Sequence, residues 1–256
     1  MLHRAKDLRG LTLDSRDGDI GKVKDFYFDD KFWTIRYLIA DTGNWLTGTQ
    51  VLISPHAMTA VNHDDGTIAV DLTKEQIRGC PPLDNDKPVS RQYENDYFGY
   101  YGWPGYWGGP SSWGPYPYIW RGGQQSADPI PRRKEWDHHL RSTRVVTGYH
   151  IKADDGDIGH VEDFVIDDKT WAIRYLVIDT QNWLPGKRVL ISPSWIRSVS
   201  WHDSSVFVNV SRDAIERAPE YINESSLTRE YETRLHSHYN RQGYWFDEPV
   251  AEALLI

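Results

Sequence analysis

The chain has 256 residues, with 29 basic and 37 acidic side chains, a formal net charge of −8 and 39% hydrophobic residues. This composition is typical of a soluble globular protein and argues against a wholly disordered one. The acidic balance also argues against nucleic acid as a partner, because phosphate binding depends on concentrated lysine and arginine. No run of 18 apolar residues exists, so the sequence predicts no transmembrane helix.

The N-terminal residues from Met1 to Lys6 carry charge where a secretory signal would be apolar, so we expect a cytoplasmic protein. Short strand-like runs follow, and Asp17-Gly18 is typical of a hairpin turn. Strands are predicted over residues 23–28, 35–40, 51–54 and 68–70. Five or six short strands in about 65 residues predict a small antiparallel barrel.

Helical segments are predicted after the strands. Thr73 is expected to cap a short helix over 74–78, and Ser211 one over 212–217. A longer helix is predicted to begin at Thr228 and to run toward His238. Cys80 is the only cysteine, which excludes an internal disulfide and a zinc site built from several cysteines.

The chain contains an internal repeat at an offset of 138. Between residues 17–55 and 155–193, 27 of the 39 positions are identical without a gap. The register continues weakly to Gly105-Tyr106-Trp107, which corresponds to Gly243-Tyr244-Trp245. Two copies at this period indicate a duplicated domain and not a solenoid.

The repeat resembles the PRC-barrel family in three motifs: Gly-x-Val-x-Asp-Phe, Trp-x-Ile-Arg-Tyr-Leu and Val-Leu-Ile-Ser-Pro. The resemblance covers about 10–83 and 148–221, and the closing Arg-x-Tyr-Glu and Tyr-Trp pieces resemble the tail of stand-alone bacterial members. It implies a mainly β fold of two small antiparallel barrels in pseudo-twofold tandem, each followed by short helices. We place the first copy at 1–96, a linker at 97–144 and the second copy at 145–256.

The family resemblance suggests three functions. The favoured one is a non-enzymatic protein-interaction or assembly module, whose two barrels form an internal pseudo-dimer and whose protein partner is unknown. A second is an accessory role like that of the photosynthetic reaction-centre H subunit, although the sequence lacks the membrane helix of those subunits. The third is a ribosome-maturation factor, which the acidic charge disfavours. Homo-oligomers and peripheral membrane contact remain open.

Few residues are candidates for chemistry. The acidic hairpin at Gly18 lacks two of the three ligand positions of a calcium loop that precede the glycine, so a turn is favoured. Asp25, Arg36 and Asp41 recur in the second copy, and we interpret them as an ion-pair network between neighbouring strands. The pairs His138-His139 and His236-Ser237-His238 have the wrong spacing for two metal ligands on one helix face and are predicted to lie on the surface. No catalytic residue, metal or cofactor is predicted.

The aromatic residues are concentrated in the linker, where residues 97–120 contain 11 of them among glycines and prolines. Such a stretch is not expected to form a regular helix. It is either an arm packed on a barrel or an exposed patch for a partner or a membrane interface, while stacking on single-stranded nucleic acid is disfavoured. Residues 132–144, with five basic and two acidic side chains, are a modest basic hinge.

Loop tryptophans in both copies, Trp45 and Trp183, are predicted either to close a barrel end, to join the two barrels, or to bind a partner. Together with the linker they make up the candidate interaction surface, which comprises Trp45, Trp183, Trp103, Tyr106, Trp107, Trp113 and Trp120.

Overall fold

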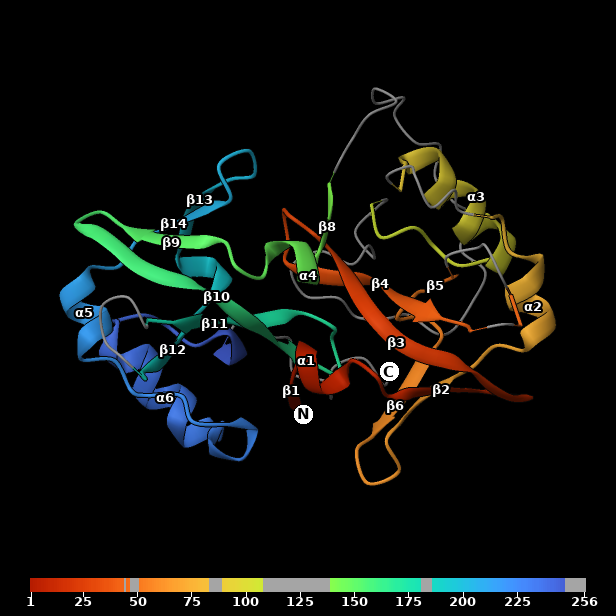
Figure 1. Cartoon of the computed structure of the whole chain (residues 1–256), viewed down its shortest axis with the longest axis horizontal. Coiled ribbons are helices and arrows are strands. Elements are labelled where there is room, and N and C mark those ends of the chain that lie inside the picture. Colours follow the sequence, from red (N-terminus) through yellow and green to blue (C-terminus); the bar gives the residue numbers. More distant parts are fainter. Residues whose placement is uncertain (44, 47–50, 83–88, 108–138, 181–185, 247–256) are drawn as a thin grey trace. The chain divides into compact units, whose positions relative to one another are not determined.

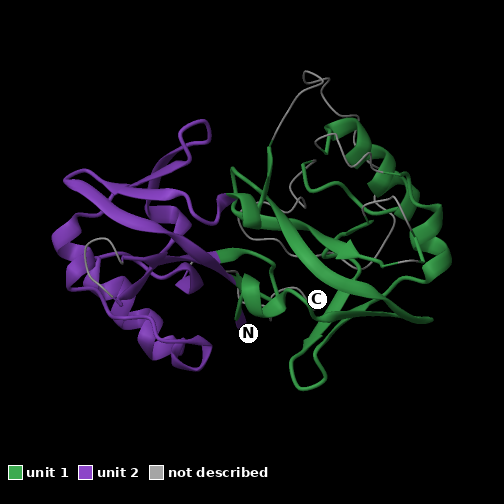
Figure 2. Cartoon of the chain, viewed as in Figure 1, with its two compact units in different colours: residues 1, 3–145, 166–173 green, residues 2, 146–165, 174–256 purple. Residues whose placement is uncertain are grey.

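The structure, a computed structural model, describes residues 1–43, 45–46, 51–82, 89–107, 139–180 and 186–246. It is mainly β, with two seven-stranded sheets and short helices (Figure 1). The chain divides into two compact units (Figure 2), of which unit 1 comprises residues 1, 3–145 and 166–173, and unit 2 the remainder. Within the described ranges, no helix is long and apolar enough to cross a bilayer.

The first sheet has the strand order β5-β4-β3-β2-β7-β6, and β8 pairs with β3 outside this path. Its strands are β2 (Thr12–Ser15), β3 (Gly18–Asp29), β4 (Thr34–Asp41), β5 (Val51–Ile53), β6 (Met58–Asn62), β7 (Thr67–Val70) and β8 (Leu140–Ser142). The long strand β3 pairs antiparallel with β4 from Lys22 opposite Asp41 to Asp29 opposite Thr34. Its inward-facing residues, among them Phe26 and Phe28, are fully buried and form the core.

The second sheet repeats this order as β12-β11-β10-β9-β14-β13, with β1 paired to β10. Its strands are β1 (Leu2–Arg4), β9 (His150–Ala153), β10 (Gly156–Asp167), β11 (Ile173–Asp179), β12 (Arg188–Ile191), β13 (Ile196–Ser200) and β14 (Ser205–Val208). The two sheets therefore confirm the duplication and the mainly β fold, and the predicted strands agree with the observed ones.

The antiparallel expectation needs one correction in each sheet. Strands β2 and β7 run parallel, as do β9 and β14. Strands β2, β3, β4 and β5 alternate in direction, and β6 is antiparallel to β7. The parallel ladder between β2 and β7 therefore means that β5 and β6 run in the same direction.

The helices carry the expected caps. The side chains of Thr73, Ser211 and Thr228 each accept a backbone hydrogen bond at the start of a helix. The helices are α1 (Ala5–Leu8), α2 (Lys74–Gly79), α3 (Arg91–Tyr101), α4 (Thr143–Val146), α5 (Arg212–Glu216) and α6 (Arg229–His238), with short 3₁₀ turns at Pro193–Trp195, Glu224–Ser226 and Tyr244–Phe246.

Helix α3 corrects the expectation for the aromatic stretch. The boundary that we placed at residue 97 falls inside this helix, which ends only at Gly102, where φ is +68°. The first five residues of the stretch are helical and include Gly99, while the dense run of glycines and prolines begins only at Gly102, which ends the helix. The described ends of the expected linker, 97–107 and 139–144, both belong to unit 1.

Candidate functional site

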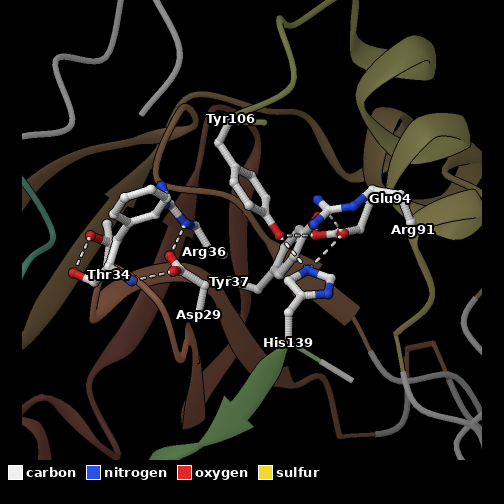
Figure 3. Close-up of polar contacts among 9 residues, drawn as sticks. Asp29, Thr34, Arg36, Tyr37, Arg91, Glu94, Tyr106 and His139 are labelled. Carbon is white, nitrogen blue, oxygen red and sulfur yellow. Dashed lines mark hydrogen bonds and ion pairs between the residues drawn. The ribbon is translucent and has the colours of Figure 1, made fainter. Parts of the chain in front are cut away.

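A buried carboxylate fastens α3 to the sheet of unit 1 (Figure 3). Glu94 is fully buried, and its Oε1 accepts hydrogen bonds from the hydroxyls of Tyr37 on β4, at 3.0 Å, and Tyr106, at 2.5 Å. Its Oε2 lies 2.9 Å from Arg91 and 3.0 Å from His139. We call these five residues the helix-docking cluster.

The local sequence explains why the cluster forms. Ser90 caps α3 through the backbone N–H of Tyr93, which sets the helical phase. Glu94, Tyr97 and Phe98 are the buried positions of that helix, at the spacing of one helical face. Burial raises the pKa of Tyr37 well above its usual value. The phenol therefore stays protonated and donates a hydrogen bond to the carboxylate of Glu94.

A buried ion pair adjoins the cluster. Arg36 is fully buried, its Nε lies 2.6 Å from Oδ2 of Asp29, and its guanidinium lies 4.2 Å from the ring centroid of Tyr106. Arg36 is therefore in an ion pair between neighbouring strands, as predicted, but the sequence did not point to its partner Asp29. Of the predicted partners, Asp25 accepts a hydrogen bond from Thr143, and Asp41 accepts one from the backbone N–H of Gly43.

Unit 2 repeats the arrangement at the offset of 138. Oε1 of Glu232 accepts hydrogen bonds from the hydroxyls of Tyr175 and Tyr244, both at 2.9 Å, and Oε2 lies 3.0 Å from Arg229. The guanidinium of Arg174 lies 4.0 Å from the ring centroid of Tyr244. Because both copies retain the same set, the cluster belongs to the common architecture of the repeat.

The two copies differ in the source of the histidine. In unit 2 the imidazole Nε2 of His236, on α6, lies 3.0 Å from the hydroxyl of Tyr175, and its Nδ1 lies 3.0 Å from the carbonyl oxygen of Gln242. The equivalent position in unit 1 is Phe98, and His139 supplies the imidazole instead. His236 is 3% exposed and the side chain of His139 is 11% exposed, so the surface location predicted for these two residues is wrong, while His138 lies outside the described residues.

Replacing His236 with phenylalanine, the residue of the first copy, should reduce the acid sensitivity of unit 2. Burial lowers the pKa of His236, so the folded state binds its proton less readily than the unfolded state. Stability is then fully present above about pH 6.5 and falls as the pH drops toward the lowered pKa. Urea unfolding at pH 7.5 and 5.5 should show a smaller loss of free energy in the variant than in the wild type; an equal loss would contradict the prediction.

The aromatic candidates of the linker that the structure describes pack against unit 1. Tyr106 is 5% exposed, Trp103 stacks on Tyr101 with ring centroids 4.4 Å apart, and the guanidinium of Arg91 lies 4.4 Å from the ring centroid of Trp107. These residues therefore form a packed arm over α3 and the sheet. Trp113, Trp120 and Trp183 lie outside the described residues.

The described ends of the linker meet in space. The hydroxyl of Tyr106 lies 2.7 Å from Nε2 of His139, although 31 intervening residues separate Trp107 from His139. The described residues on either side of 108–138 are therefore in contact within unit 1. The chain passes from unit 1 to unit 2 only later, at Val145–Val146.

Trp45, the other described candidate, belongs to its own barrel. Its indole N–H donates a hydrogen bond of 3.0 Å to the carbonyl oxygen of Ile20, and Arg78 lies 5.8 Å from its ring centroid. The half-buried ring is therefore held against β3 of its own sheet. The acidic hairpin is likewise structural, because Asp17 accepts a hydrogen bond from the backbone N–H of Lys74, the first residue of α2.

A cavity of about 160 Å³ lies between α2, α3 and β5 in unit 1. Leu52, Ile77, Cys80, Tyr93 and Tyr101 are among its lining residues. Burial raises the pKa of the Cys80 thiol to about 11, so the thiol is neutral at physiological pH.

We expect alkylation of native Cys80 by iodoacetamide at pH 8 to be about 100-fold slower than that of a free cysteine, because the thiolate is the reacting species. The rate should rise with pH toward 11 and should become ordinary in 6 M guanidinium. Mass spectrometry of timed samples measures it, and native labelling as fast as that of the unfolded chain would disprove the prediction.

The repeated sheets, caps and motifs agree with the comparison of this chain with known families. The PRC-barrel domain matches residues 2–77 and 150–215, which together exceed half of the chain. The chain belongs to the PRC-barrel family. Both matched segments begin near the strands β1 and β9 and end in or near the short helices α2 and α5, so the PRC-barrel motifs coincide with the repeated units of the sheet. No curated protein matches the chain.

Proposed function

We propose that this tandem PRC-barrel protein is a non-enzymatic interaction or assembly module. The observation that carries the proposal is the helix-docking cluster, whose acid, phenols and imidazole are the residue types of general acid–base chemistry. In the first copy Glu94, Tyr37 and Tyr106 are buried and joined by hydrogen bonds, and Glu232, Tyr175 and Tyr244 repeat these hydrogen bonds in the second. These groups therefore hold a helix on a sheet, and we expect the protein to bind its partner through its surface.

We also propose that the two barrels form an internal pseudo-dimer. In unit 1 the backbone N–H of Ile35 donates to the carbonyl of Trp171 and that of Ile173 to the carbonyl of Trp33, both at 2.8 Å. These residues are equivalent at the offset of 138, so the two hydrogen bonds are reciprocal, as in an isologous contact. This reciprocity supports the pseudo-twofold arrangement.

An affinity pull-down from the protein's own cells tests the interaction role. The informative variant replaces residues 108–138 with a short Gly-Ser bridge. Its ends meet at Tyr106 and His139, so unit 1 should stay folded, whereas deletion from residue 97 would remove the buried Tyr97 and Phe98. We expect the intact chain to retain a protein and the variant to lose it.

The other outcomes of the pull-down decide between the alternatives. Recovery of membrane pigment–protein complexes would indicate a role like that of the reaction-centre H subunit, and recovery of ribosomal subunits would indicate ribosome maturation. A chain that retains no protein at all, but carries a small ligand in native mass spectrometry, would overturn the proposal in favour of an enzyme or a ligand-binding protein.

A further inference from the structure

The edge of β3 in unit 1 holds a strand from a distant part of the chain. Strand β8 pairs antiparallel with β3 through Tyr27–Ser142, Phe28–Arg141 and Asp29–Leu140. Ser142 and its partner Asp25 are 117 positions apart in sequence. An open sheet edge is a template for an added strand, so this position is a strand-acceptor site.

One carboxylate of the acceptor contacts the end of the added strand. Oδ2 of Asp25 accepts a hydrogen bond of 2.5 Å from the hydroxyl of Ser142. Its Oδ1 accepts from the hydroxyl of Thr143, at 2.7 Å, and from the backbone N–H of Arg144, at 3.2 Å. Asp25 thus binds the first two residues of helix α4, which directly follows strand β8.

Two further acidic residues contact the basic side chains of the strand. Oδ2 of Asp30 lies 2.9 Å from Nη2 of Arg141, and the backbone N–H of Asp30 donates to the carbonyl of His139, at 2.9 Å. The ring of His139 in turn contacts Glu94 of the helix-docking cluster. Three carboxylates therefore face the segment 139–144, which carries three basic side chains, so the site and its occupant are complementary in charge.

The same arrangement recurs at the start of the chain. Asp168 corresponds to Asp30; its backbone N–H donates to the carbonyl of Met1, at 3.0 Å, and its Oδ2 lies 3.0 Å from Nε2 of His3. Positions 1 and 3 correspond to positions 139 and 141 at the offset of 138. Since β1 pairs with β10 and β8 with β3, each copy's leading segment adds to the long strand of the other copy.

We propose that residues 139–144 of a second copy of this chain can occupy the acceptor site on β3, so that two molecules associate by exchanging these segments. The inference rests on the proposed interaction role and names one partner for it. Both acceptors already take a leading segment from a different copy of the domain, and a second molecule presents the identical segment. Within one chain the tether gives the segment an effective concentration of about millimolar, so the wild type remains monomeric when dilute.

Opposite charge reversals test the exchange with purified full-length chains. One chain carries Asp30→Arg and the other Arg141→Asp. In each chain alone, residues 30 and 141 then carry the same charge and repel each other. In a mixture, exchange restores an opposite-charge pair at both acceptors. We expect each single variant to be monomeric and an equal mixture to form mainly 1:1 heterodimers, measured by native mass spectrometry and size-exclusion chromatography with light scattering.

Two controls keep the test independent of folding. The double variant Asp30→Arg/Arg141→Asp restores the pair within one chain and should be monomeric with the melting temperature of the wild type. A mixture of this double variant with the wild type should form no heterodimer, because exchange would create like-charge pairs. Single variants that stay monomeric when mixed, a double variant that is not restored, or heterodimers in the control mixture would each overturn the proposal. No cellular partner is involved, so this test and the pull-down can fail separately.

Discussion

The variant Arg36→Met is expected to lower the free energy of unfolding by about 3–5 kcal/mol, the usual cost of removing one partner of a buried ion pair. Arg36 has no exposed surface, and its partner Asp29 is 3% exposed, so the substitution leaves a carboxylate uncompensated inside the protein. It also removes the cation that lies over the ring of Tyr106. Urea unfolding followed by circular dichroism measures the loss.

A matched pair on the same unit provides the control. Arg16 pairs with Asp71 at 2.6 Å, but both side chains are about half exposed. Water and salt screen such a pair, so Arg16→Met should destabilise the protein far less than Arg36→Met. Adding Asp29→Asn to Arg36→Met should recover part of the loss, since the stranded charge is then removed. Equal effects of the two methionine substitutions would show that burial of the Arg36 pair has no energetic weight.

Gly21→Ala should also destabilise the protein strongly, by about 3 kcal/mol or more, since a strained φ alone costs about 1–3 kcal/mol. Gly21 has φ of +123°, and a Cβ placed there would lie 2.0 Å from the carbonyl oxygen of Asp41. The strands β3 and β4 would have to separate at this end, because the obstacle is backbone and not a movable side chain. The equivalent Gly159, with φ of +158°, has the same contact with Asp179.

Gly43→Ala is the control that separates the cost of a positive φ from the cost of the steric clash. Gly43 also has a positive φ, +59°, but no atom lies within 4 Å of a Cβ built there. Its substitution should therefore cost only about 1–2 kcal/mol, the penalty of left-handed backbone for a residue with a side chain. Thermal unfolding of both variants measures the difference, and a Gly21 variant no less stable than the Gly43 variant would show that β3 and β4 are not in close contact here.

Patterns confined to a few neighbouring residues predicted much of the fold. The strands around Asp17-Gly18 and the helices capped by Thr73, Ser211 and Thr228 follow from local sequence, and the structure confirms them. Caps and turns depend on atoms within four residues of each other, which is why the sequence alone carries them.

The partner of Arg36 could not be predicted because β3 is bulged. Its register with β4 shifts between Val23 and Asp25 and again between Tyr27 and Phe28. Each extra residue changes which side chains face the core, so counting alternate positions along β3 fails. Only after both shifts does Asp29 lie opposite Thr34, close enough in space to reach Arg36.

The buried histidines and the added strand were missed for a different reason. His139 contacts Glu94, and Asp30 contacts Arg141, across more than 40 residues of sequence. Spacing arguments test whether two side chains share one helix face and say nothing of partners on distant elements. One available clue was that Glu94 and Tyr106 recur as Glu232 and Tyr244, which indicates a shared buried role for the carboxylate and the phenol.

The contact between Tyr106 and His139 also bears on how the gene can change. The described residues on the two sides of 108–138 meet at this contact, so the ends of that stretch are held close together. Closing a flexible loop costs only about 0.6 kcal/mol more for each doubling of its length. We therefore expect changes of length between residues 107 and 139 to be tolerated better than changes of length within the strands.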